Sequence, residues 1–269
     1  MPYATTSDNV QLYFEEAGEG TPILFIHEFA ADYASWEPQM RYFSRSHRCI
    51  TYSARGYIPS HIPEAEAYSY KHFRDDAIAM LDHLKIPAAH LVGLSMGASI
   101  IQDFYAQHSG RVASMVLADT RPGFEAPFDP AAREEFLRLR LTPLRAGKEP
   151  ADIAPSVARS LMGASAGEDV YARLVESMQA LHKASYMKTI EGRVTWQPTF
   201  VPSKVTVPTL VVVGADDRLT PPAMAKSIAD AIPGAHLAVI PAAGHLSNIE
   251  QPKVFNEIVL GFLAAASRA

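Results

Sequence analysis

The pentapeptide Gly93-Leu-Ser-Met-Gly97 decides the fold of this 269-residue chain. It ends the apolar run His90–Leu94 and opens a helical pattern over Met96–His108, so its serine falls at a sharp turn from a strand into a helix. The flanking glycines avoid clashes in such a turn, and the helix N-terminus directs N–H groups at negative charge that develops nearby. Chance matches to this pattern are mostly ordinary turns. The strand–turn–helix context favours an exposed, nucleophilic Ser95.

Apolar runs of strand length recur along the chain and alternate with helical patterns. Such near-continuous runs are typical of strands buried on both faces of a parallel sheet. Only Val10–Phe14, before a Glu19-Gly20 turn, alternates polar and apolar residues, which predicts an antiparallel edge hairpin. The whole pattern predicts an open, mostly parallel sheet with helices on both faces. The runs are Pro22–His27, Arg48–Ser53, His90–Leu94, Val112–Ala118, Thr209–Val213 and His236–Ile240.

The segment 121–203 breaks this alternation. It contains no convincing buried strand, and prolines separate its helix-like stretches at about 131–144, 151–162, 167–183 and 185–192. We therefore predict an all-helical insertion over the carboxyl ends of the strands, where open α/β sheets bind ligands. Residues 1–120 and 204–269 would form the core domain, and residues 121–203 a helical cap domain.

Composition narrows the classes of partner. Hydrophobic residues make up 48% of the chain and charged residues 20%, as in ordinary globular proteins. A net charge of −5, from 24 basic and 29 acidic residues, argues against a nucleic-acid surface. The first twenty residues hold no apolar block, and no apolar stretch approaches the ~18 residues that cross a bilayer. We expect a soluble, cytoplasmic protein that acts on a small molecule, with no nucleic-acid or membrane partner; the sequence does not give its oligomeric state.

The sequence offers little for a cofactor. Cys49 is the only cysteine, which excludes a disulfide within the chain and a cysteine-based zinc site. Its place inside a predicted strand indicates an inert core residue. No group of histidines and carboxylates has zinc-like spacing, and no glycine loop is arranged to cradle a phosphate. We expect neither a metal nor a cofactor.

A serine nucleophile needs a base, and the base needs an orienting acid. Among ten histidines, His245 is favoured because it follows the last predicted strand and so reaches the sheet edge of Ser95. Asp216 and Asp217 follow the strand Thr209–Val213 to the same edge, and Asp119 ends an earlier strand. The order serine, aspartate, histidine is that of α/β-hydrolases and differs from the orders of chymotrypsin-like and subtilisin-like enzymes.

Across nearly its full length the chain resembles the α/β-hydrolase-fold superfamily. The likeness rests on Gly93–Gly97, His27-Glu-Phe-Ala30 with Trp36 beyond it, Arg55-Gly56, Gly214-x-x-Asp217 and Gly244-His245. Its size and helical insertion are similar to the branch of enol-lactonases, small carboxylesterases and cofactor-free haloperoxidases. The resemblance implies an α/β fold with an eight-stranded, mostly parallel sheet. It also selects Asp217, three residues beyond the strand-ending glycine, over Asp216 as the acid. Some relatives carry their acid at the position of Asp119, which is a turn residue if Asp217 is the acid.

The same resemblance implies that the backbone N–H groups of Phe29 and Met96 form an oxyanion hole. The chain departs from the family pattern at Glu28, where relatives usually carry glycine. An ionised carboxylate facing the oxyanion would oppose the charge that the site must stabilise. We therefore expect Glu28 to point away and to pair with Arg55. The alternative is a special role, such as positioning water or recognising a cationic substrate.

These residues predict a serine hydrolase that cleaves a small, fairly apolar carboxylic ester or lactone through an acyl-enzyme. Candidate pocket residues are Phe29, Phe124, Trp196 and Leu219, although apolar side chains more often serve packing. A serine nucleophile argues against the dehalogenase and epoxide hydrolase relatives, which use aspartate. Two alternatives stay open: carbon–carbon or amide cleavage or perhydrolysis on the same residues, and a ligand-sensing protein with slow hydrolysis.

Overall fold

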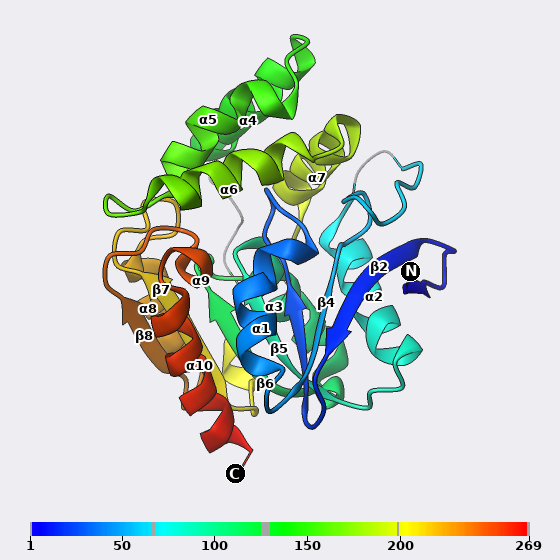
Figure 1. Ribbon diagram of the computed structural model, residues 1–269, viewed down its shortest axis with the longest axis vertical. Coiled ribbons are helices and arrows are strands. Elements are labelled where there is room, and N and C mark those ends of the chain that lie inside the picture. The colour runs from blue at the N-terminus through cyan, green and yellow to red at the C-terminus, as the bar shows by residue number, and fades with distance from the viewer. Residues whose placement is uncertain (1, 66–67, 125–129, 198, 268–269) are drawn as a thin grey trace.

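The computed structural model describes residues 2–65, 68–124, 130–197 and 199–267, and an eight-stranded sheet forms its centre (Figure 1). The strand order is β1-β2-β4-β3-β5-β6-β7-β8. All pairings from β4 to β8 are parallel, and β2 pairs antiparallel with both β1 and β4. The predicted mostly parallel sheet is confirmed. The strands are β1 (Tyr3–Thr5), β2 (Gln11–Ala17), β3 (Pro22–Ile26), β4 (Arg48–Tyr52), β5 (Ala89–Leu94), β6 (Val112–Ala118), β7 (Thr209–Gly214) and β8 (His236–Ile240).

The predicted edge hairpin consists of β1 and β2, with Thr5 opposite Gln11. The turn signal at Glu19-Gly20 leads instead from β2 into β3, and β4 lies between these two strands. The chain needs glycine here because Gly18 has a φ of +80° and a Cβ on it would lie 2.3 Å from the carbonyl oxygen of His47. The turn was located correctly, but it joins strands that are not neighbours.

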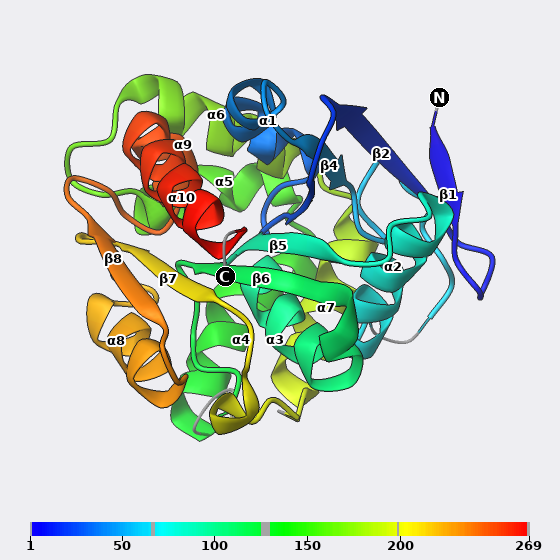
Figure 2. The ribbon, with the colours of Figure 1, turned by 90° about the horizontal axis from the view of Figure 1, so that it is seen from below.

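Helices cover both faces of the sheet, as Figure 2 shows. One face carries α1 (Glu37–Phe43) and α10 (Pro252–Ala266), and the other carries α2 (Tyr70–His83), α3 (Met96–His108) and α8 (Pro222–Ala231). Every residue of β5 and β7 is buried, because these central strands are covered on both sides. A short helix, α9 (Ser247–Glu250), and 3-10 turns at Tyr33–Trp36, Ser109–Arg111 and Pro202–Lys204 complete the elements. The predicted α/β architecture, an eight-stranded sheet with helices on both faces, is confirmed.

Four helices occupy the segment between β6 and β7, as predicted: α4 (Pro130–Arg145), α5 (Pro150–Leu161), α6 (Glu168–Gln179) and α7 (Lys183–Thr195). In Figure 1 they lie together beyond one end of the sheet. The helix α5 begins at Pro150 and buries Ile153, Val157 and Leu161, which share one face at a spacing of four residues. The division of the chain into a core domain and a cap domain stays a prediction. Within the described ranges, no helix is long and apolar enough to cross a membrane.

Candidate active site

Ser95 sits at the junction of β5 and α3 in a backbone conformation that side chains rarely adopt, with φ +52° and ψ −108°. Its neighbours must be small. A Cβ on Gly97 would lie 2.0 Å from the carbonyl oxygen of Ile26, and one on Gly93 would lie 2.5 Å from the backbone of Gly97. The Ser95 N–H donates to the carbonyl of Ala118 at 2.8 Å, which ties the turn to β6. The strained turn is therefore held by its packing.

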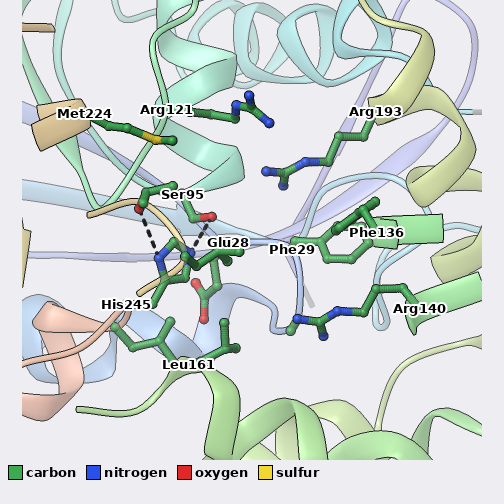
Figure 3. Close-up of a pocket in the computed structure, with 14 residues that line it drawn as sticks. Glu28, Phe29, Ser95, Arg121, Phe136, Arg140, Leu161, Arg193, Met224 and His245 are labelled. Carbon is green, nitrogen blue, oxygen red and sulfur yellow. Dashed lines mark hydrogen bonds between the residues drawn. The ribbon is translucent and has the colours of Figure 1, made fainter. Parts of the chain in front are cut away.

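The structure brings His245 into contact with Ser95 (Figure 3). The distance from Ser95 Oγ to His245 Nε2 is 2.9 Å. The histidine loop is fixed from the helical insertion, because the His245 N–H donates to the carbonyl of Leu161 at 2.8 Å. Glu250 adds a second link: its Oε2 accepts from the N–H of Gly163 at 2.8 Å and from that of Gly244 at 2.9 Å. The insertion thus helps to position the imidazole.

Asp217 lies on the other side of the imidazole, with Oδ2 2.8 Å from His245 Nδ1. It also accepts hydrogen bonds from the N–H groups of Leu219 and Thr220 and from the Thr220 hydroxyl. Burial raises the pKa of this carboxyl, but the hydrogen bonds and charge of its neighbours outweigh that effect and hold the pKa below its ordinary value. An ionised carboxylate only accepts, so we assign the ring proton to Nδ1. Nε2 is then free to accept from the Ser95 hydroxyl.

The other two candidate acids lie elsewhere. Asp216 is exposed. Asp119 is buried and accepts from the Gly214 N–H at 2.8 Å and from the backbone and hydroxyl of Ser247. Burial, reinforced by the charge of Asp217, raises the pKa of Asp119 well above its ordinary value. Asp119 therefore holds together the ends of β6, β7 and α9, while Asp217 is the carboxylate that contacts the imidazole.

The two N–H groups expected to form an oxyanion hole have no hydrogen-bond acceptor among the described residues. They belong to Phe29, which follows β3, and to Met96, the first residue of α3. The Tyr57 hydroxyl donates to the Phe29 carbonyl at 3.1 Å and so fixes the peptide that follows this N–H. Buried His27, whose pKa is lowered by desolvation to about 4, is neutral and joins the Glu28 carbonyl to the Ala54 N–H. No local pattern in the sequence indicates this contact of Tyr57.

The prediction that Glu28 points away from the cavity and pairs with Arg55 is wrong. The residue lines the cavity beside Ser95 and His245 instead of pointing away (Figure 3), and its Oε2 accepts from the Ser35 hydroxyl at 3.0 Å. It does not pair with Arg55, because two other carboxylates, Asp8 and Asp76, already bind that guanidinium at 2.6 Å each. Burial raises the pKa of Glu28 to about 7. Below that pH the group is mainly a neutral acid, which removes the expected repulsion of an oxyanion.

A cavity of about 270 Å³ opens onto Ser95 and His245. Of the residues expected to line it, Phe29 and Leu219 do so. Trp196 does not: it packs on Tyr70, with ring centres 4.6 Å apart, and faces a separate surface hollow. Phe124 packs against the core instead. The remaining apolar wall comes mainly from Phe136, Leu161 and Met224.

Three arginines that were not among the predicted site residues also line this cavity: Arg121, Arg140 and Arg193. Each comes from the segment between β6 and β7. Isolated cations in amphipathic helices indicate solvent-facing side chains, so the sequence held no signal for them. The packing of α4 against α7 turns two of them inward. Among the described residues, no cluster of three or more His, Cys, Asp or Glu side chains is placed to hold a metal ion.

Comparison with known proteins shows the family to which this chain belongs. The model of the alpha/beta hydrolase fold family matches residues 21–252, so the chain belongs to that family. A malate-bound thermophilic esterase from Thermogutta terrifontis superposes with a TM-score of 0.90 at 27% identity, covering 98% of each chain. The enol-lactonase from Burkholderia xenovorans LB400 gives 0.84 at 27% identity, over 98% of this chain and 100% of the other.

A curated relative carries a different name. The non-heme chloroperoxidase CPO-A1 of Kitasatospora aureofaciens is 28% identical over 279 residues, which cover 98% of this chain and 99% of the relative. The resemblance predicted from the sequence is confirmed, and so is the class of enzyme, a hydrolase of this family.

Proposed function

We propose that the chain is a serine hydrolase that cleaves a small carboxylic ester or lactone through an acyl-enzyme. One observation carries the proposal: Ser95, His245 and Asp217 form a continuous hydrogen-bonded chain at the edge of the sheet, with distances of 2.9 and 2.8 Å. The names of the esterase and enol-lactonase relatives support the same substrate class.

The proposed reaction has two halves. In the first, Ser95 Oγ attacks the ester carbonyl, His245 Nε2 takes the hydroxyl proton, and Asp217 stabilises the imidazolium. The N–H groups of Phe29 and Met96 hold the oxyanion, and His245 returns the proton to the departing alcohol oxygen. In the second half, His245 deprotonates a water molecule, which attacks the acyl carbon and releases the acid and Ser95. For a lactone, the alcohol stays attached to the acyl group.

Turnover of p-nitrophenyl acetate by the wild type and by S95A tests the proposal. We expect multiple turnovers by the wild type and a loss of at least about 10³-fold in S95A, because the substitution removes the hydroxyl that attacks the carbonyl. Equal rates in the two proteins would contradict the serine mechanism. A single burst of one equivalent would favour the ligand-sensing alternative, in which the acyl-enzyme is not hydrolysed.

A second activity is favoured by the haloperoxidase name of the Kitasatospora relative. If hydrogen peroxide replaces water in the second half, it attacks the acyl-enzyme and releases a peracid and free Ser95. Measuring peracid in the presence of an ester and hydrogen peroxide tests this reaction. S95A should form none, because peracid formation requires the same acyl-enzyme.

A further inference from the structure

The charge of the cavity does not match a purely apolar substrate. Three of the residues that line it are arginines, and Glu28 is its one acidic lining residue in the described part of the chain. The pKa of Glu28, raised by burial to about 7, makes that single negative charge incomplete near neutrality. Arg140 and Arg193 alone therefore outnumber the one acidic residue that lines the cavity.

Among these residues, Arg193 gives the strongest indication that the cavity binds an anion. It lies on α7, is nine-tenths buried, and forms no ion pair or side-chain hydrogen bond with any described residue. Its guanidinium carbon lies 5.9 Å from the ring centre of Phe29 and 5.7 Å from that of Phe136. Such ring contacts stabilise a cation only partly, and a buried charge without a counter-ion is strongly unfavourable. An anion that enters the cavity would remove this penalty.

Arg140, on α4, is directed into the same space (Figure 3). It forms no ion pair with any carboxylate in the described ranges. Both guanidinium groups act on one phenol: burial raises the pKa of Tyr186, and the charges of Arg140 and Arg193 oppose that rise. The Tyr186 hydroxyl is buried and has no hydrogen-bond partner among the described residues. Arg140 and Arg193 therefore reach the cavity from two helices of the insertion, α4 and α7.

We propose that Arg140 and Arg193 form a binding site for a carboxylate, so that the substrate is an ester or lactone that also carries a second, ionised carboxylate. This inference rests on the proposed hydrolase function, whose reacting bond lies at Ser95. Planar guanidinium groups bind a carboxylate with two parallel hydrogen bonds. The volume of about 270 Å³ suits a short chain between the ester carbonyl and the free carboxylate.

Matched substrates test the proposal. The monomethyl esters of succinate, glutarate and adipate are each compared with the ester in which the free carboxylate is replaced by a carboxamide of the same shape. Acid release is followed by titration at constant pH. We expect wild-type kcat/KM for the best carboxylate ester to exceed that of its amide partner by about 10- to 100-fold, because charge-assisted hydrogen bonds are lost in the amide.

Variants then locate the site. R193Q and R140Q should each lower the ratio of the two kcat/KM values by about tenfold, and R193K should retain part of it because the charge is kept. R138Q is the matched control, since Arg138 lies on the same helix as Arg140 but is exposed and pairs with Glu135. The control should leave the ratio unchanged. If R193Q does not fold, R140Q still tests the site.

The outcomes separate the two proposals. Turnover of neutral esters with a ratio near one in the wild type would overturn the carboxylate site and leave the hydrolase function standing. Calorimetric titration of S95A with glutarate and with its monoamide tests the site without turnover. Tighter binding of glutarate, weakened by R193Q, supports the carboxylate site even if no ester is hydrolysed, and equal binding of the two overturns it.

Discussion

The edge of the sheet and the helical insertion meet at one cavity, but their polar side chains differ in whether they have partners within the protein. At the edge, the three reacting side chains have their partners within the chain: Ser95 contacts His245, and His245 contacts Asp217, which Thr220 also binds. From the insertion, Arg140 and Arg193 reach the cavity without a carboxylate partner in the described structure. The reacting groups at the edge already bind one another, whereas we propose that the arginines of the insertion gain a counter-ion only when a ligand binds.

Two buried arginines show the same difference. The side chain of Arg55 is 4% exposed and is bound by Asp76 and Asp8. Arg193 is buried to a similar degree and has two aromatic rings in place of carboxylates. A buried guanidinium with internal counter-ions holds the fold together. One without them has its charge available to a bound molecule. Burial alone therefore does not separate a structural arginine from one that binds a ligand.

The largest expected effect lies at the edge of the sheet. H245A should lower kcat for any ester by about 10³-fold or more, because the serine then has no base. The double variant S95A/H245A should be little worse than either single variant, since the two residues act as one unit. Steady-state kinetics with p-nitrophenyl acetate measure this. Losses that multiply would show that the two residues act independently.

Asp217 and Asp119 provide the next contrast. D217N should lower kcat by about 10³-fold, because an amide can favour the wrong ring tautomer of His245. D119N should have a much smaller effect on kcat and should mainly lower the melting temperature, since Asp119 binds Gly214 and Ser247 instead of the imidazole. Kinetics and thermal unfolding of both variants distinguish the roles. A larger loss of kcat in D119N than in D217N would show that the acid is Asp119, after β6, and not Asp217, after β7.

Glu28 should make stability depend on pH. Its pKa rises from an ordinary 4.5 to about 7 on folding, so the unfolded chain ionises first as the pH increases. Relative to E28Q, the wild type should therefore lose stability from about pH 4.5 to about pH 7, by up to about 3 kcal/mol. Glutamine keeps an acceptor for Ser35 and does not titrate. Denaturant unfolding at several pH values measures the difference, and parallel curves for the two proteins would contradict the buried acid.

The smallest expected effects are on KM, and they distinguish two aromatic residues of the insertion. F136A should raise KM for small esters by about tenfold with little change in kcat, because Phe136 lines the cavity but does not touch the reacting atoms. W196F should leave KM unchanged, since Trp196 packs on Tyr70 outside that cavity. Michaelis–Menten kinetics of both variants check this. A change of KM in W196F alone would mean that substrate enters the other hollow.

The fold and most of the reacting groups could be predicted from the sequence because local patterns of residues indicate both. Apolar runs located β3 to β8 closely, and four helices were expected between β6 and β7. Ser95 was found because a strained turn admits only small neighbours, and His245 was found because it follows a strand at the same edge. Strand position left Asp119, Asp216 and Asp217 open as the acid, and the family resemblance selected Asp217. The register of the hairpin was less accessible, since the Glu19-Gly20 turn shows where a strand ends and not which strand it pairs with.

The errors concern side chains whose environment other segments provide. Glu28 and Arg55 follow two neighbouring strands, β3 and β4, yet Ser35 binds the first side chain, and Asp8 and Asp76 bind the second. Phe124 and Trp196 lie near the ends of the insertion but pack away from the cavity. Arg140 and Arg193 carry no local signal of a binding site, because a charged helical residue usually faces solvent.

The sequence by itself determined the order of elements and placed Ser95 and His245 at the sheet edge, because hydrophobic periodicity and turn chemistry act over a few neighbouring residues. Only the tertiary structure decided which charges face the cavity and which are neutralised elsewhere. That choice depends on how α4 and α7 pack above the sheet. Electrostatic partners are set by distance in space, and residues far apart along the chain supply them.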